Sequence, residues 1–139
     1  MKDDEKIYYY EGFKYILSRP LHKSTGIIIP KRVCVSFCTM ETTGDLTIFP
    51  PFPWDGCSGP AYDDETNMRA GAIHDCGYKL IRLGLIPHST RGQWDLNLQR
   101  DCRKDGMAKW RAWYYLQGVD HLANFATRKS EEPKELSAP

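Results

Sequence analysis

A change of residue pattern near the middle of the chain is the strongest constraint on its fold. Before residue 54, short segments rich in aromatic and β-branched residues are separated by glycine and proline, which is typical of short β-strands. Pro50, Pro51 and Pro53 then follow closely, and proline interrupts a sheet because its nitrogen has no hydrogen to donate. From residue 65 onward, apolar residues recur at helical spacing instead. The expected strands are residues 7–10, 13–17, 26–29, 33–37 and 46–49.

The fourth of these segments has apolar or neutral side chains on both of its faces. The segment alternates three apolar residues, Val33, Val35 and Phe37, with small neutral residues such as Cys34. A strand covered on two sides has this pattern. We therefore expect residues 33–37 to form a buried central strand.

Three helices are expected in the second half. The first spans about residues 65–83, where apolar residues recur on one face. The second begins after a capping residue, Ser89 or Thr90, and ends near Gly106, because glycine commonly follows a helix. The third spans about residues 107–126 and carries an aromatic face that must pack on something.

Strands gathered before helices predict an α+β fold, with a small N-terminal antiparallel β-sheet followed by about three α-helices packed on it. The chain has 139 residues, of which 41% are hydrophobic, and this is enough for one core. We expect residues 1–126 to form a single domain. Residues 127–139 are polar and proline-bearing, and we expect them to form a C-terminal tail.

Charge and composition exclude several classes of partner. A net charge of +1 gives no general attraction to nucleic acid, so nucleic-acid binding is not expected. No run approaches the ~20 apolar residues of a transmembrane segment, and the charged first residues are unlike a secretion signal. We therefore expect a soluble protein made in the cytosol. Its five cysteines include no Cys-x-x-Cys pair, which favours buried free thiols.

His74, Asp75 and Tyr78 are the main candidates for chemistry. They lie in the first expected helix, where Tyr78 follows His74 by four residues, so the three can line one rim. A histidine is suited to act as a general base near neutral pH. Asp75 offers a hard oxygen ligand to a cation such as calcium, or a negative charge to a nearby base.

Asp95 is the candidate partner of His74. A carboxylate that holds the far ring nitrogen of a catalytic histidine fixes its tautomer and stabilises its charged form. Asp95 lies near the start of the second expected helix and can face the first across a helical hairpin. Asp101 and Asp105 lie among basic residues, so we expect them on a solvated face instead.

The loop at residues 54–60 is the second part of the expected site. Its glycines, including Gly56, permit exposed backbone groups that can bind an ion or an oxyanion. Asp55 adds a carboxylate. Ser58 is a weaker candidate nucleophile because no Gly-x-Ser-x-Gly motif surrounds it.

Each of these features also has a purely structural interpretation. His74 can be a hydrogen-bonded helix residue, Asp75 can pair with Lys79 on the helix surface, and Asp95 can complement a helix N-terminus. The loop can be a plain turn. The aromatic face of the third helix can belong to the core or to an interface with another subunit.

The segments PFPWDGCSGP at 51–60 and AGAIHDCGY at 70–78 resemble a family of small phage and prophage proteins that carries a domain-of-unknown-function label. In that family a strand ends in an aspartate-bearing loop, and an Ala-x-x-His-Asp-x-x-Tyr helix follows. The likeness covers about residues 46–125. It implies a phage protein in the host bacterial cytoplasm or in the virion, with phage structural proteins among its partners.

The same His-Asp-x-x-Tyr helix is similar to the catalytic helix of sn-2 type phospholipases. The resemblance implies that His74 activates water, Asp75 binds calcium, Asp95 on the next helix orients the histidine, and Tyr78 supports the hydrogen bonding. Asp55 and Gly56 are the expected additional ligands of the cation. The implied substrate is a phospholipid ester, while a cell-envelope or phosphoester bond is an alternative.

Two classes of function follow from these patterns. The first is a phage-encoded hydrolase with a His-Asp site and metal-assisted ester hydrolysis. The second is a non-enzymatic virion, tail or assembly protein in which the same residues form a structural His-Asp network. A small regulatory or anti-defence binding module without catalysis is a third interpretation.

Overall fold

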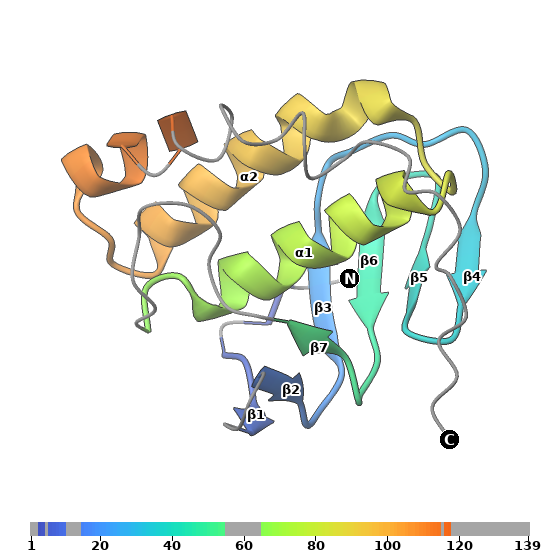
Figure 1. Cartoon of the computed structure of the whole chain (residues 1–139), viewed down its shortest axis with the longest axis horizontal. Coiled ribbons are helices and arrows are strands. Elements are labelled where there is room, and N and C mark those ends of the chain that lie inside the picture. Colours follow the sequence, from blue (N-terminus) through green and yellow to red (C-terminus); the bar gives the residue numbers. More distant parts are fainter. Residues whose placement is uncertain (1–2, 5, 11–14, 55–64, 115, 118–139) are drawn as a thin grey trace, which may run out of the picture.

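The computed structural model describes residues 3–4, 6–10, 15–54, 65–114 and 116–117, and these form an α+β fold in which strands precede helices (Figure 1). Its strands are β1 Tyr9–Tyr10, β2 Tyr15–Leu17, β3 Leu21–Ser24, β4 Val33–Val35, β5 Cys38–Met40, β6 Asp45–Ile48 and β7 Pro53–Trp54. Its helices are α1 Met68–Arg82, the short 3-10 helix η1 His88–Thr90, and α2 Arg91–Lys104. Residues 109–114 and 116–117 are also helical. The expected fold class is confirmed.

The strands form two small antiparallel sheets rather than one. The larger has the order β3-β6-β5-β4, with Leu21 opposite Ile48 and Val33 opposite Met40. The smaller has the order β1-β2-β7. Pro53 lies in β7 at the edge of this second sheet, where a missing backbone hydrogen is tolerated. Pro50 and Pro51 separate the two sheets along the chain, so the prolines redirect the chain and do not end the β-structure.

The expected strand at residues 26–29 is wrong. Its buried Ile27 and Ile29 alternate with the exposed Ile28, as in a half-buried strand. Its backbone, however, bonds to the turn between β5 and β6: the Ile29 amide donates to the Thr42 carbonyl. A side-chain pattern of period two therefore arose here without a ladder of strand hydrogen bonds. The regular strand of this region is β3, at residues 21–24.

The expected buried central strand at residues 33–37 is also wrong. Residues 33–35 form β4 at the edge of the larger sheet, and residues 36–37 turn the chain into β5. Cys34 is exposed, in contrast to the buried thiols of Cys38, Cys76 and Cys102. The apolar side chain of Phe37 stacks on Phe52, with ring centroids 5.8 Å apart, and does not belong to a strand.

Helices α1 and α2 run antiparallel, side by side, across one face of the larger sheet (Figure 1). The expected apolar stripe of α1 is buried at Met68, Ala72, Cys76 and Leu80, where it packs on the apolar side chains of the sheet. Its last member, Leu83, is exposed, because α1 ends at Arg82. A second, smaller apolar cluster joins both helices to the helical residues that follow; it consists of Ala70, Leu98, Cys102, Met107 and Ala112.

The helix boundaries agree with the signals in the sequence. Gly84 and Gly106 follow α1 and α2 with φ angles of 72° and 106°, which favour glycine. Thr90 is the N-cap residue of α2, as expected, but its hydroxyl donates to the Pro87 carbonyl and does not cap the helix. Of the expected third helix, residues 118–126 lie outside the described residues, as do residues 127–139 of the expected tail.

Gly77 is a point of close contact between α1 and α2. A Cβ atom added at this position would collide with the indole ring of Trp94 on α2. Trp94 is fully buried, so its ring has no space into which it can withdraw. Glycine at this position therefore sets the separation of the two helices.

We expect Gly77→Ala to lower the free energy of unfolding by about 1–3 kcal/mol, the usual cost of forcing an extra carbon into a packed interior. Gly92→Ala is the matched control, since it adds the same carbon to α2 with no atom within 4 Å. That variant is expected to be as stable as the wild type, or up to ~1 kcal/mol more stable. Urea unfolding followed by circular dichroism measures both, and equal stabilities of the two variants would contradict the packing described.

Candidate functional site

Three of the residues predicted to carry chemistry meet between α1 and α2. Nε2 of His74 on α1 lies 2.7 Å from Oδ1 of Asp95 on α2. The Tyr78 hydroxyl donates to the same Asp95 oxygen. The rings of His74 and Tyr78 lie against each other, with centroids 4.0 Å apart. The predicted contact of His74 with Asp95 across a helical hairpin is thus present.

Helix geometry explains why the three side chains converge. His74 and Tyr78 are four residues apart on α1 and so share the face that is turned toward α2. Gly77 lies beside Tyr78 and lets α2 approach, and Asp95 follows directly after the Trp94 that packs on this glycine. The packing of an indole ring on a glycine therefore places the Asp95 carboxylate against His74.

The network is almost entirely removed from solvent. The exposed fractions are 4% for His74, 2% for Asp95 and 6% for Tyr78. Oδ1 of Asp95 takes both hydrogen bonds, while Oδ2 is buried without a hydrogen-bond partner among the described residues. A buried carboxylate oxygen left in this state is costly, so the network is held in place by the packing around it.

This geometry selects one tautomer of His74. An ionised carboxylate can only accept hydrogen bonds, so the Nε2 atom that faces Asp95 must carry a proton. In the neutral ring, the lone pair is then on Nδ1. A histidine in this state can take a proton at Nδ1 while Asp95 stabilises the resulting positive charge.

The predicted metal ligands are described only in part. Asp75 is half-buried on α1, next to His74 in the chain. Asp55, Gly56 and the candidate nucleophile Ser58 lie outside the described residues. Within the described ranges, no three or more histidine, cysteine, aspartate or glutamate side chains are grouped so that they could hold a metal ion.

A buried network of charged side chains was missed by sequence reasoning. Lys23 Nζ on β3 lies 2.8 Å from Asp101 Oδ1 on α2 and 3.2 Å from Asp3 Oδ2. Arg69 on α1 binds Asp105 through two hydrogen bonds of 3.0 Å. The expectation of a solvated face is therefore wrong for Asp101, which is buried, and holds only partly for Asp105, which is half-buried and bound to Arg69. No local signal could reveal pairs separated by 36 and 78 residues.

The ion pairs of this network shift the pKa values of two members. Burial would lower the pKa of Arg69, but the Asp105 carboxylate outweighs it and holds this pKa above its ordinary value. Partial burial would raise the pKa of Asp3, but the Ser24 amide and the Lys23 ammonium together hold it below its ordinary value. Both groups therefore remain charged at neutral pH.

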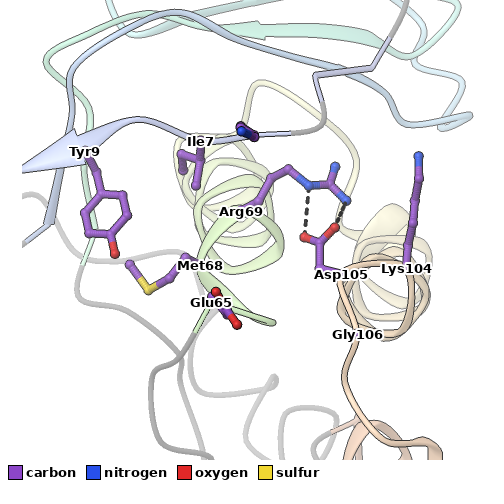
Figure 2. A pocket seen from close by; sticks show the side chains of 9 residues that line it. Ile7, Tyr9, Glu65, Met68, Arg69, Lys104, Asp105 and Gly106 are labelled. Carbon is purple, nitrogen blue, oxygen red and sulfur yellow. Dashed lines mark hydrogen bonds and ion pairs between the residues drawn. The ribbon is translucent and has the colours of Figure 1, made fainter.

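Two cavities lie near these networks. The larger, of about 570 Å³, has Arg69 and Asp105 on one side and Ile7, Tyr9 and Met68 on the other (Figure 2). Its lining includes none of the three residues of the His74 network. A smaller cavity of about 380 Å³ borders α2 and includes Asp95 in its lining, together with residues 116–117.

Comparisons with known proteins do not identify a relative. Neither a scan against protein-family models nor searches of curated proteins and of solved structures found a match to this chain. In the described part of the chain, no helix is both long enough and apolar enough to span a bilayer. The candidate site therefore has to be argued from its own geometry.

We expect Asp101→Asn to lower the free energy of unfolding by about 3 kcal/mol. This is the lower end of the usual cost of breaking a buried ion pair, since Asp3 still faces Lys23. Glu41→Gln is the matched control, because it breaks the exposed Arg32–Glu41 pair with the same change of chemistry. Its effect is expected to stay below ~1 kcal/mol. Thermal and urea unfolding measure both, and a cost for Asp101→Asn as small as that for Glu41→Gln would show that the buried network adds nothing to stability.

Proposed function

We propose that this protein is a phage-encoded hydrolase that cleaves ester bonds, with phospholipids as its substrate class. The observation that carries the proposal is the hydrogen bond of 2.7 Å between His74 and Asp95, which joins two helices inside the protein. A carboxylate so placed behind a histidine is what a general base needs. Tyr78, whose hydroxyl donates to the same carboxylate oxygen, supports the geometry.

In the proposed reaction His74 acts first as a base and then as an acid. Its Nδ1 takes a proton from water, and the water oxygen forms a bond to the ester carbonyl carbon. Asp95 stabilises the imidazolium that results, and Tyr78 holds Asp95 in position. When the tetrahedral intermediate collapses, the carbon–oxygen bond to the alcohol breaks and His74 returns its proton to the leaving oxygen. The products are a carboxylic acid and an alcohol.

The proposed site also takes a divalent cation, with calcium as the first choice. Asp75 supplies a carboxylate oxygen, and Asp55 and the backbone of Gly56 complete the expected ligand set. When bound, the cation would polarise the ester carbonyl and stabilise its developing negative charge. The position of Asp75 directly after His74, only half-buried on α1, supports this role.

A second candidate function is a virion or assembly component in which the network is structural. One observation favours it: His74 and Asp95 are 4% and 2% exposed, as expected for a closed polar network in a core. Turnover separates the two candidates, because a structural network stabilises the protein without catalysing any reaction.

We expect the wild type to hydrolyse phospholipid esters and His74→Ala to lower kcat/KM by about 10²- to 10⁴-fold, the usual contribution of a general base. Asp95→Asn should also lower kcat, because the amide can present a donor to Nε2 and favour the wrong tautomer. His88→Ala is the control, since His88 is exposed at the start of η1, and its activity should equal that of the wild type.

A screen of phospholipid, phosphoester and cell-envelope substrates on folded protein tests this proposal. Circular dichroism shows whether each variant is folded. Absence of turnover in the wild type on every substrate class, or equal turnover in His74→Ala, would overturn the hydrolase and leave the assembly component.

Calcium binding is expected to depend on Asp75. Titration calorimetry with calcium, magnesium and zinc should show binding to the wild type and its loss in Asp75→Asn, since the amide is neutral and a weaker ligand. Glu41→Gln neutralises an exposed carboxylate that is not part of the proposed site, and this variant should bind calcium as the wild type does. Identical calorimetric titrations of wild type and Asp75→Asn would remove Asp75 from the proposed site.

A further inference from the structure

The helical residues after α2 expose an unusual amount of aromatic surface. Trp110, Trp113 and Tyr114 are 73%, 58% and 54% exposed. The other two tryptophans of the chain, Trp54 and Trp94, are buried. Aromatic side chains of this size are normally covered, and a cluster of exposed ones marks a surface that contacts something else.

The order of side chains around this helix is that of a docking face. At about 100° per residue, residues 109–114 follow one another around the axis in the order Lys109, Trp113, Trp110, Tyr114, Arg111 and Ala112. The aromatic residues are thus adjacent, with one basic residue at each border. Ala112 lies on the opposite side of the axis and is fully buried in the second apolar cluster. The protein therefore holds the helix through Ala112 and presents the aromatic face outward.

The chain segment that carries this face has an excess of basic residues. Residues 103–114 include four basic side chains and one acidic side chain, Asp105. The charge of Asp105 is matched by Arg69 through two hydrogen bonds, so it does little to offset the nearby cations. The chain as a whole has a net charge of only +1, which makes this a local concentration of positive charge.

We propose that Trp110, Trp113 and Tyr114 form a membrane-docking face that seats this protein on an anionic phospholipid bilayer. Tryptophan and tyrosine prefer the headgroup region, because their rings are apolar and their N–H and O–H groups can remain hydrated. Lysine and arginine at the borders of such a face reach anionic headgroups. The bilayer is preferred to a second copy of the chain, because pairing two copies through this face would bring like charges together.

This inference deepens the proposed function, because a phospholipid hydrolase must bind the bilayer that contains its substrate. Only the biological role of the docking face rests on the proposed function. Docking itself can be measured without turnover. Vesicles of ether-linked phospholipids contain no ester bond at the acyl positions, so binding to them does not depend on whether His74 is catalytic.

We expect the protein to co-sediment with ether-lipid vesicles that contain phosphatidylglycerol, and to bind purely zwitterionic vesicles at least about tenfold more weakly. Tryptophan emission should shift to shorter wavelength on binding. Because Trp54 and Trp94 are already buried, this shift reports on Trp110 and Trp113.

Two variants and a control test the face itself. Trp110→Ala with Trp113→Ala should lower the partition coefficient at least about tenfold. Lys109→Glu keeps every aromatic ring and should weaken binding to anionic vesicles at least about fivefold, the effect of one basic charge at such a surface. Tyr10→Ala with Ile28→Ala also removes two exposed apolar side chains, but from the β-sheet region, and should bind as the wild type does.

Equal binding to anionic and zwitterionic vesicles, or wild-type binding by both Lys109→Glu and the tryptophan variant, would overturn the proposal. A wild-type dimer in light scattering that the tryptophan variant loses would assign the face to a second copy instead. Vesicle binding without any hydrolysis of ester lipids would support the docking face and count against the proposed reaction, so the two proposals fail separately.

Discussion

The packing of Trp94 against Gly77 is the contact on which the candidate site depends. It lets α1 and α2 lie close enough for a short aspartate side chain on one helix to reach a histidine ring on the other. A hydrogen bond requires its two atoms to be placed within a few tenths of an ångström, and a packed interior can hold them so because it deforms little. The polar chemistry of the site is therefore a consequence of apolar packing beside it.

The buried ion pairs perform a different task at the other end of the helix pair. Lys23 on β3 binds Asp101 on α2, and Arg69 on α1 binds Asp105, which directly follows α2. Burying such charges is expensive, and apolar residues of similar volume often stabilise a protein as well or better. Ion pairs instead favour one arrangement of the elements over others, because each buried cation is neutralised only when its own carboxylate lies opposite it. One pair therefore links α2 to β3, and the other links α1 to the C-terminal end of α2.

The sequence was informative where a pattern is local. Helical spacing and the glycines after each helix located α1 and α2, and spacing of four residues placed His74 and Tyr78 on one face. It was misleading at residues 26–29, where side chains alternate as in a strand but the backbone does not pair as one. It was also misleading at Phe37, whose apolar side chain stacks on Phe52 and does not continue a strand. The contact of Asp95 with His74 was predictable from the His-Asp-x-x-Tyr motif and the helical hairpin. The contact of Asp101 with Lys23 joins residues 78 positions apart, and no local sequence pattern around either residue indicates it.

Asp95 and Asp101 lie on the same helix, and both are bound to side chains of other elements. If α2 slid by one helical turn along its axis, both carboxylates would lose their partners together, and Trp94 would leave its place against Gly77. The two carboxylates are therefore satisfied together in the observed register of α2, so polar and apolar contacts favour the same position of this helix along its axis.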